Sequence, residues 1–267
     1  MTKTIGIIGS GLVGKAVARL ATAAGYNVVI SNSRGPESIS ALVEELGPLA
    51  SAGTTEEAIA AGDIVTLSIP LAAFEQLPGD KFAGKIVLDQ SNYYPGMGGF
   101  QREDLDKGEL TSSELMQRHL PGARLVKGLH NLSWIHMQAN ATPEGSENRT
   151  TLPIAGDDAE AKRAVTEFFQ RIGYDVVDAG SLADSWRIEP HTPIYFWRYA
   201  PTMQLDAQGA EAERTYQQPG KPVSKDEARK LIDEAQRPSP IGGTLEGMPQ
   251  VHIDLFMAQA SADTVNK

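Results

Sequence analysis

A glycine motif near the start of the chain limits the possible folds more than any other feature. The apolar run at residues 4–8 is typical of a buried strand, and the apolar spacing at residues 12–24 predicts a helix. Between them lies a G-x-G-x-x-G sequence, the position that this motif has in dinucleotide-binding folds. Its six residues are Gly9, Ser10, Gly11, Leu12, Val13 and Gly14.

Each glycine of the motif is required for a different physical reason. Gly9 allows a tight turn, Gly11 allows the backbone to approach a pyrophosphate, and Gly14 allows the helix to pack closely on the strand. The positive end of the following helix would face the phosphates. The alternative is a glycine-rich turn that only packs, but position, spacing and the following helix all favour dinucleotide binding.

Apolar runs alternate with helical patterns well beyond the motif, which indicates a parallel sheet covered by helices. Strands are expected at residues 4–8, 27–30, 49–52, 63–69, 85–88, 124–127, 151–155 and 175–177. Helices are expected at residues 12–24, 37–46, 55–61, 112–119 and 158–172. The predicted fold class is α/β, a Rossmann-type doubly wound parallel sheet with a small C-terminal helical or irregular unit.

The amino-acid composition changes after the last of these strands. Aromatic residues and prolines crowd residues 186–199, and an S-x-x-E capping box at Ser224 predicts a short charged helix. The rest of the tail is rich in polar residues, proline and glycine, so a loop-heavy segment is expected. We expect an NADP-binding domain at residues 1–180 and a smaller unit at 181–267 that contributes an acceptor pocket and a possible dimer interface.

The end of the second strand favours NADP(H) over NAD(H). An NAD-binding protein usually has an acidic residue there for the ribose hydroxyls. This chain instead has Ser31, Asn32, Ser33 and Arg34, which offer hydroxyl, amide and guanidinium donors for a 2′-phosphate. The alternative is an ordinary solvated arginine in a loop. Ser68, Ile69 and Pro70 end the fourth strand, where the nicotinamide half would bind, or where a proline simply ends a strand.

Composition excludes several other functions. The chain has no cysteine and five scattered histidines, so cysteine chemistry is excluded and no metal site is expected. A net charge of −10 argues against nucleic acid and anionic membranes as partners. No apolar run is long enough to span a bilayer, and no leader-like segment is evident, so we expect a cytoplasmic protein.

Several segments together resemble the F420-dependent NADP oxidoreductase family, which moves hydride between NADPH and a 5-deazaflavin. The resemblance covers roughly residues 4–200, and is carried by residues 5–34, 68–70, 124–132, 155–158 and 178–182. It implies that His130 lies near the hydride acceptor and orients it or assists protonation; the alternative is a histidine at the end of a strand that bonds to the backbone. It also implies an acceptor pocket, which we assign to Asn131, Leu132, Trp134, Ser185 and Trp186.

The resemblance leaves the acceptor open, because the turn after His130 departs from the family pattern with Asn131, Ser133 and Trp134. The acceptor would be coenzyme F420, and the alternatives are a flavin, a carbonyl, an imine or a quinone. A non-catalytic NADP(H) sensor is a further alternative. The anionic tail of F420 would need a basic patch, for which the nearby candidates are Lys127, Arg187 and Arg198. The family also implies a homodimer.

Overall fold

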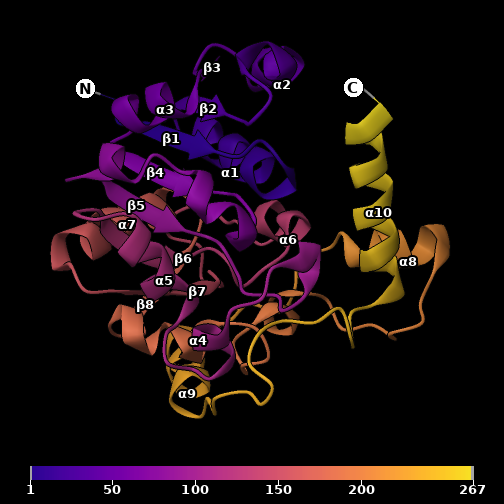
Figure 1. Cartoon of the computed structure of the whole chain (residues 1–267). Coiled ribbons are helices and arrows are strands. Elements are labelled where there is room, and N and C mark those ends of the chain that lie inside the picture. Colours follow the sequence, from indigo (N-terminus) through magenta and orange to yellow (C-terminus); the bar gives the residue numbers. More distant parts are fainter. Residues whose placement is uncertain (1, 266–267) are drawn as a thin grey trace.

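Eight strands form one sheet in the order β3-β2-β1-β4-β5-β6-β7-β8 (Figure 1). The computed structural model describes residues 2–265; residues 1, 266 and 267, at the ends of the two expected units, lie outside the described residues. The strands are β1 (Thr4–Ile8), β2 (Asn27–Ser31), β3 (Ala50–Ala52), β4 (Ile64–Leu67), β5 (Ile86–Asp89), β6 (Arg124–Gly128), β7 (Thr151–Gly156) and β8 (Asp175–Asp178). The predicted Rossmann-type sheet is confirmed.

The strand order reverses between β1 and β4, which places a crevice at their carboxyl ends. All neighbouring strands are parallel except β6 and β7, which are antiparallel. The sequence did not indicate this reversal, because a short apolar run does not reveal the direction of a strand.

Helices cover both faces of the sheet. They are α1 (Leu12–Ala23), α2 (Ser40–Leu46), α3 (Thr55–Ala61), α4 (Glu103–Asp106), α5 (Ser112–His119), α6 (Trp134–Ala139) and α7 (Ala159–Ile172). Side chains of α1 and α7 pack with Ile5, Ile7 and Val126 in one core cluster. Side chains of α3 and α5 pack with Val65 and Leu125 in a second cluster on the opposite face. The alternation of Leu125 and Val126 follows the two-residue period of a strand.

Local signals in the sequence account for where several helices begin. Thr54 and Thr111 each form a capping box, in which the threonine hydroxyl and a glutamate three residues later satisfy the first amide groups. Asp158 accepts a hydrogen bond from the backbone of Ala161 and so caps α7.

The C-terminal region is more helical than the sequence predicted. It contains α8 (Gly209–Tyr216), α9 (Lys225–Asp233) and α10 (Gln250–Val265). The helix predicted after Ser224 is confirmed, because the Ser224 hydroxyl accepts from the backbone of Glu227. The expectation of a loop-heavy tail is wrong for α8 and α10. In α10 apolar residues occur on all sides, so the helical periodicity that would have revealed it is missing.

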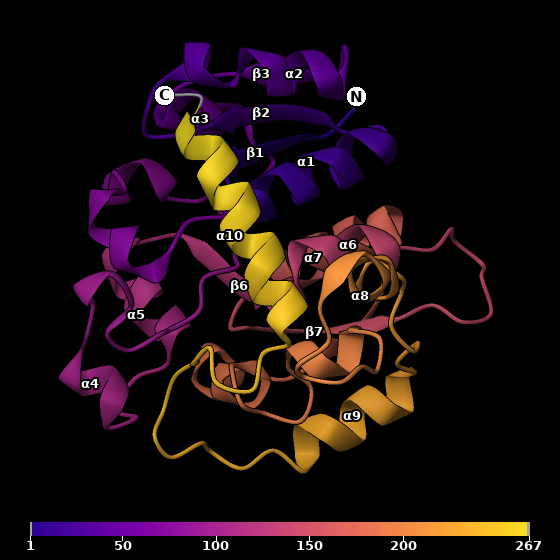
Figure 2. The same ribbon diagram turned by 90° about the vertical axis from the view of Figure 1, so that its right-hand side faces the viewer.

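Helix α10 stands apart from the layers, on the side where the strands end (Figures 1 and 2). Its first turns are fixed by His252, whose ring contacts those of Trp134 and Phe196 and whose Nδ1 lies 2.9 Å from the hydroxyl of Tyr216. Further along, Phe256 and Met257 are exposed. Within residues 2–265, no helix combines the length and apolar character needed to cross a membrane.

Candidate active site

The glycine loop lies between β1 and α1 at the crevice. Gly9 has a φ of +104°, and a Cβ there would lie 2.3 Å from the carbonyl oxygen of Ser68. A Cβ on Gly14 would lie 1.8 Å from the carbonyl oxygen of Gly9. Gly11 is the N-cap of α1, with no side-chain cap and no acidic residue in the first turn. The first amide groups of α1 are therefore available to an anion, and the loop fits a pyrophosphate.

The four residues after the core of β2 divide into two pairs. Ser31 is fully buried, and its hydroxyl donates to a backbone carbonyl of β1 over 3.3 Å. Asn32 donates to Ser10 Oγ over 3.2 Å, and its Oδ1 accepts from the backbone of Arg34 over 3.0 Å. Asn32 thus ties this turn to the glycine loop, while Ser33 and Arg34 are exposed. The structure brings Asn32, Ser33 and Arg34 to the surface of the crevice but turns the Ser31 side chain into the sheet.

The end of β4 lies directly against the glycine loop. The Ser68 carbonyl and the Ile69 side chain are the nearest groups to Gly9, and Pro70 precedes the 3₁₀ turn Leu71–Gln76. The Ser68 hydroxyl donates to Gln90 Oε1 over 2.5 Å. Ser68 therefore links the glycine loop to the residue that follows β5.

A buried charge cluster lies beneath the ends of β5 and β6. Lys127 is fully buried, and its Nζ donates to the carbonyl oxygen of Ser91 and, over 3.0 Å, to Ser112 Oγ. The same Nζ lies 3.6 Å from Asp89 Oδ2 and 4.0 Å from Glu189 Oε1. Ser112 Oγ donates to Glu189 Oε1 over 2.7 Å. Buried charges persist when they are paired and hydrogen-bonded in this way.

This buried charge cluster was not expected from the sequence, which made Lys127 a candidate for a basic patch that would bind the anionic tail of F420. A signal was present: Asp89 ends β5 and Lys127 lies near the end of β6, so residues of opposite charge lie at the carboxyl ends of two strands. The two residues are direct partners in the sheet. Glu189 is distant in sequence and could not be assigned to the cluster without the structure.

The turn that contains His130 is fixed by several backbone contacts. Leu129 has a φ of +56°, a left-handed conformation that strains a residue with a side chain and that is frequent at functional sites. Asn92 Nδ2 donates to the carbonyl oxygen of His130 over 3.2 Å. His130 Nε2 and Asn131 Nδ2 approach the carbonyl oxygen of Ile188 to 2.8 Å and 3.4 Å.

The imidazole of His130 is held in its neutral form. Burial, and next the positive charge of Lys127, lower its pKa well below the usual value. Because Nε2 faces a carbonyl oxygen, the ring proton belongs on Nε2, which leaves Nδ1 as an acceptor. Nδ1 has no hydrogen-bond partner among the described residues. The ring can therefore accept one further hydrogen bond.

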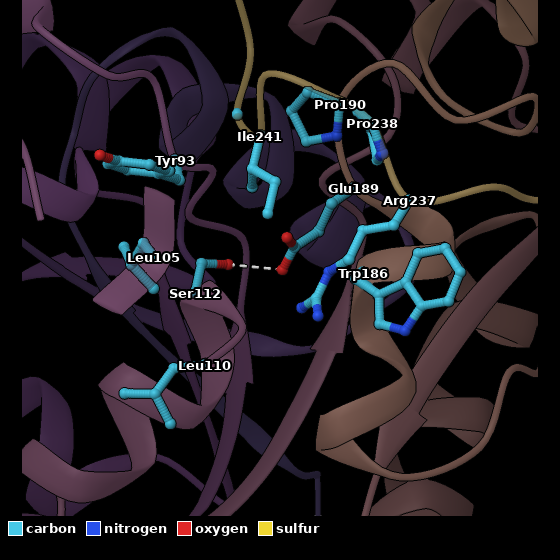
Figure 3. A pocket seen from close by; sticks show the side chains of 11 residues that line it. Tyr93, Leu105, Leu110, Ser112, Trp186, Glu189, Pro190, Arg237, Pro238 and Ile241 are labelled. Carbon is cyan, nitrogen blue, oxygen red and sulfur yellow. Dashed lines mark hydrogen bonds between the residues drawn. The ribbon is translucent and has the colours of Figure 1, made fainter. Parts of the chain in front are cut away.

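The other expected acceptor residues lie in different places. Trp186 lines a small cavity with Ser112, Glu189 and Arg237 (Figure 3). Ser185 is buried and donates to Glu189 Oε1 over 3.3 Å. The cavity volume is about 10 Å³, room for about one water molecule. An aromatic acceptor does not fit there in this arrangement.

The two tryptophans assigned to the acceptor pocket pack against different partners. Trp134 packs on α10, with ring centroids 5.1 Å from His252 and 6.1 Å from Phe256. The Trp186 ring is stacked by Arg187 at 4.5 Å and Arg237 at 5.7 Å. Leu132 is buried in the core cluster that contains Ile5 and Val126. The structure therefore groups His130, Asn131 and Leu132 on one turn and separates Trp134 from Trp186.

The three basic candidates for an anionic acceptor tail all have other contacts. Lys127 belongs to the buried charge cluster, Arg187 stacks on Trp186, and Arg198 pairs with Glu227. In the part of the chain that the structure describes, no three His, Asp or Glu side chains are grouped as a metal site.

The uncapped helix end at the reversal of strand order defines an α/β dinucleotide-binding protein. Residues 4–93 match the model of the family NADP oxidoreductase, coenzyme F420-dependent. The crystal structure of a hypothetical protein from Sinorhizobium meliloti, SMa0349, shares 32% sequence identity, covers 71% of this chain and 90% of that chain, and has a TM-score of 0.61. Residues 4–93 therefore belong to the F420-dependent NADP oxidoreductase family, which confirms the family resemblance over that part of the chain.

Other known proteins are similar to this chain over part of their length. Metalloreductase STEAP3 from Rattus norvegicus is 29% identical over 187 residues, which cover 69% of this chain and 35% of that protein. The protein YjhV from Escherichia coli K12 is 41% identical over 56 residues, 21% of this chain and 41% of that protein. The chain therefore spans less than half the length of these two relatives. A candidate F420-dependent NADP reductase from an Arthrobacter species shares the fold, with a TM-score of 0.58 and 21% identity over 69% of this chain and 87% of that chain.

Proposed function

We propose that this protein transfers hydride between NADPH and a small-molecule acceptor that binds beside the turn of His130. The observation that carries the proposal is the uncapped N-terminus of α1, joined through Ser10 and Asn32 to the exposed turn of Arg34. The free backbone amide groups at the N-terminus of α1 are suited to bind a pyrophosphate, and the Arg34 guanidinium is suited to bind a 2′-phosphate. The nicotinamide half would then lie along Ser68, Ile69 and Pro70.

In such a reaction the cofactor supplies the hydride, and the protein binds, orients and excludes water. The residues around His130 are suited to these tasks. The strained turn at Leu129 is held by Asn92 and by the carbonyl of Ile188, so it is rigid. The neutral ring of His130 would accept a hydrogen bond from the acceptor through Nδ1. Asn131, Leu132 and Trp134 would form the wall next to it.

Coenzyme F420 is the first acceptor to test, since it is the acceptor of the family. A less anionic acceptor is the second candidate, for a specific reason: Lys127 and Arg198, two of the basic residues near the site, are paired with carboxylates. They would not be available to the phosphate and glutamate tail of F420. A flavin, a quinone, a carbonyl or an imine would place fewer demands on a chain with a net charge of −10.

NADPH oxidation followed at 340 nm tests both candidates. The purified chain is assayed with F420, flavins, quinones, and small carbonyl and imine compounds, with NADH as the control for the 2′-phosphate. Turnover with F420 supports the first candidate, and turnover with another acceptor alone supports the second. Binding of NADPH without turnover of any acceptor would favour a sensor and contradict the proposal.

We also propose that residues 181–267 complete the acceptor pocket and contribute to a homodimer. Apolar side chains are exposed on this part of the chain, among them Trp197, Phe256 and Met257. Exposed apolar groups that cluster are typical of interfaces between subunits. Light scattering on the purified chain tests this, and a mass equal to that of one chain would exclude the dimer.

A further inference from the structure

Buried polar atoms without partners gather at the carboxyl ends of β5 and β6. Among the described residues, eight buried side-chain atoms have no hydrogen-bond partner, and four of them belong to residues that follow β5 and β6: Gln90 Nε2, Asn92 Oδ1, His130 Nδ1 and Asn131 Oδ1. A buried polar atom that lacks a partner is costly, and native structures contain few of them. Their concentration at the edge where a nicotinamide would bind indicates that a ligand supplies the missing partners.

Gln90 is connected to the glycine loop through Ser68. Its Oε1 accepts from Ser68 Oγ over 2.5 Å, and Ser68 contacts the backbone of Gly9. The side chain of Gln90 is buried, with 7% of the residue exposed. Gln90 Nε2 is therefore a donor, held next to the path of a bound dinucleotide, that has no acceptor of its own.

Asn92 offers the complementary group. Its Nδ2 donates to the carbonyl oxygen of His130 over 3.2 Å, an assignment that the carbonyl partner fixes. Asn92 Oδ1 is then an acceptor without a donor. One free donor and one free acceptor, two residues apart, match the hydrogen-bonding groups of a primary carboxamide.

The turn that bears both residues is held from beneath by the buried charge cluster. Lys127 Nζ donates to the carbonyl oxygen of Ser91. Asp89 Oδ1 accepts from the backbone of Ser91 over 2.9 Å and from its hydroxyl over 2.6 Å. Ser91 lies between Gln90 and Asn92, so these contacts fix the spacing of the two amides. Such preorganisation is what a site needs in order to orient a ring for hydride transfer.

We propose that Gln90 and Asn92 bind the carboxamide of the nicotinamide, Gln90 Nε2 donating to its oxygen and Asn92 Oδ1 accepting from its nitrogen. Lys127 and Asp89 are positioning residues for this pair. The inference rests on the proposed use of NADP(H) and adds how the nicotinamide ring is oriented.

Calorimetric binding to three nucleotides tests the inference: NADP⁺, its 3-acetylpyridine analogue, and 2′-phospho-ADP-ribose, which has no nicotinamide. The analogue keeps the carbonyl but has no N–H. Gln90→Leu and Asn92→Leu should each raise the Kd for NADP⁺ about tenfold, the factor that one lost hydrogen bond produces. Both should bind 2′-phospho-ADP-ribose as the wild type does. With the analogue, the loss in Gln90→Leu should persist and the loss in Asn92→Leu should largely disappear.

Thermal unfolding of Gln90→Leu and Asn92→Leu, compared with that of a control variant, separates binding from folding. Gln218→Leu removes an exposed amide at the end of α8 and should change nothing. The carboxamide site is overturned if Gln90→Leu and Asn92→Leu bind NADP⁺ normally, or if they also lose affinity for 2′-phospho-ADP-ribose. If the wild type binds none of the three nucleotides, the proposed function itself fails.

Discussion

The two ends of the crevice are built in opposite ways. At the nucleotide end, between β1 and β4, the shape depends on the absence of side chains at Gly9, Gly11 and Gly14. At the other end, beneath β5 and β6, the shape depends on buried charged side chains around Lys127. A backbone site of the first kind is fixed by local sequence, whereas a cluster of the second kind requires residues from three distant segments. The nucleotide end should therefore be sensitive to added atoms, and the other end to removed charge.

The largest effect is expected from removal of the buried cation. Lys127→Met would leave Asp89 and Glu189 buried without a counter-charge, which should lower the free energy of unfolding by roughly 3–5 kcal/mol. Urea denaturation measures this. Lys127→Met combined with Asp89→Leu should be less destabilised than Lys127→Met alone. Equal stability of Lys127→Met and the wild type would show that the cluster does not hold this end together.

Added atoms at the nucleotide end should have the next largest effect. The new Cβ of Gly14→Ala would meet the Gly9 carbonyl, so about 1–3 kcal/mol of stability should be lost. A Cβ on Gly11 meets nothing within 4 Å, so Gly11→Ala should keep its stability and lose NADPH affinity instead. Thermal unfolding together with NADPH titration distinguishes them. Equal changes in stability and in NADPH affinity in the two variants would contradict a phosphate-binding site at Gly11.

The choice between NADPH and NADH depends on an exposed residue, so a smaller effect is expected. Arg34→Ala should weaken NADPH binding by about 1.5 kcal/mol, a little over tenfold, because a charged hydrogen bond to the 2′-phosphate is lost. NADH binding should not change. Titration of both cofactors, with Arg163→Ala on the exposed side of α7 as the control, measures this. Equal losses of affinity for NADPH and NADH would show that Arg34 does not bind the 2′-phosphate.

Helix caps in the two regions give the smallest and most direct comparison. Thr54 caps α3 in the nucleotide half and Thr111 caps α5 next to the buried charge cluster, both through capping boxes. Thr54→Ala should cost about 1 kcal/mol. Thr111 is buried and also donates to the Leu182 carbonyl over 3.0 Å, so Thr111→Ala should cost more, up to about 2 kcal/mol. If Thr54→Ala lowers the free energy of unfolding more than Thr111→Ala does, the region around the buried charge cluster is not the more tightly packed of the two.

Much of the fold could be predicted because its signals are local. Every strand of the sheet overlaps a segment that was predicted to be a strand, and the caps at Ser224 and Asp158 mark helices that the structure contains. The prediction was wrong for α8 and α10, where sequence periodicity is weak and packing of Tyr216 against His252 accompanies the helices. The direction of β7 also could not be predicted from the sequence, because the same apolar run is compatible with a parallel or an antiparallel strand.

The sequence by itself determined the nucleotide end: the positions of the three glycines, the lack of an acid after β2, and the family. Those features follow from residues adjacent in the chain, whose conformational needs can be stated without a fold. Only the tertiary structure decided that Glu189 joins Lys127, that Trp134 and Trp186 pack apart, and that Gln90 and Asn92 face one edge with unpaired atoms. Each depends on residues distant in sequence that meet in space, and no local pattern specifies which distant partners satisfy a buried charge or leave a buried amide open.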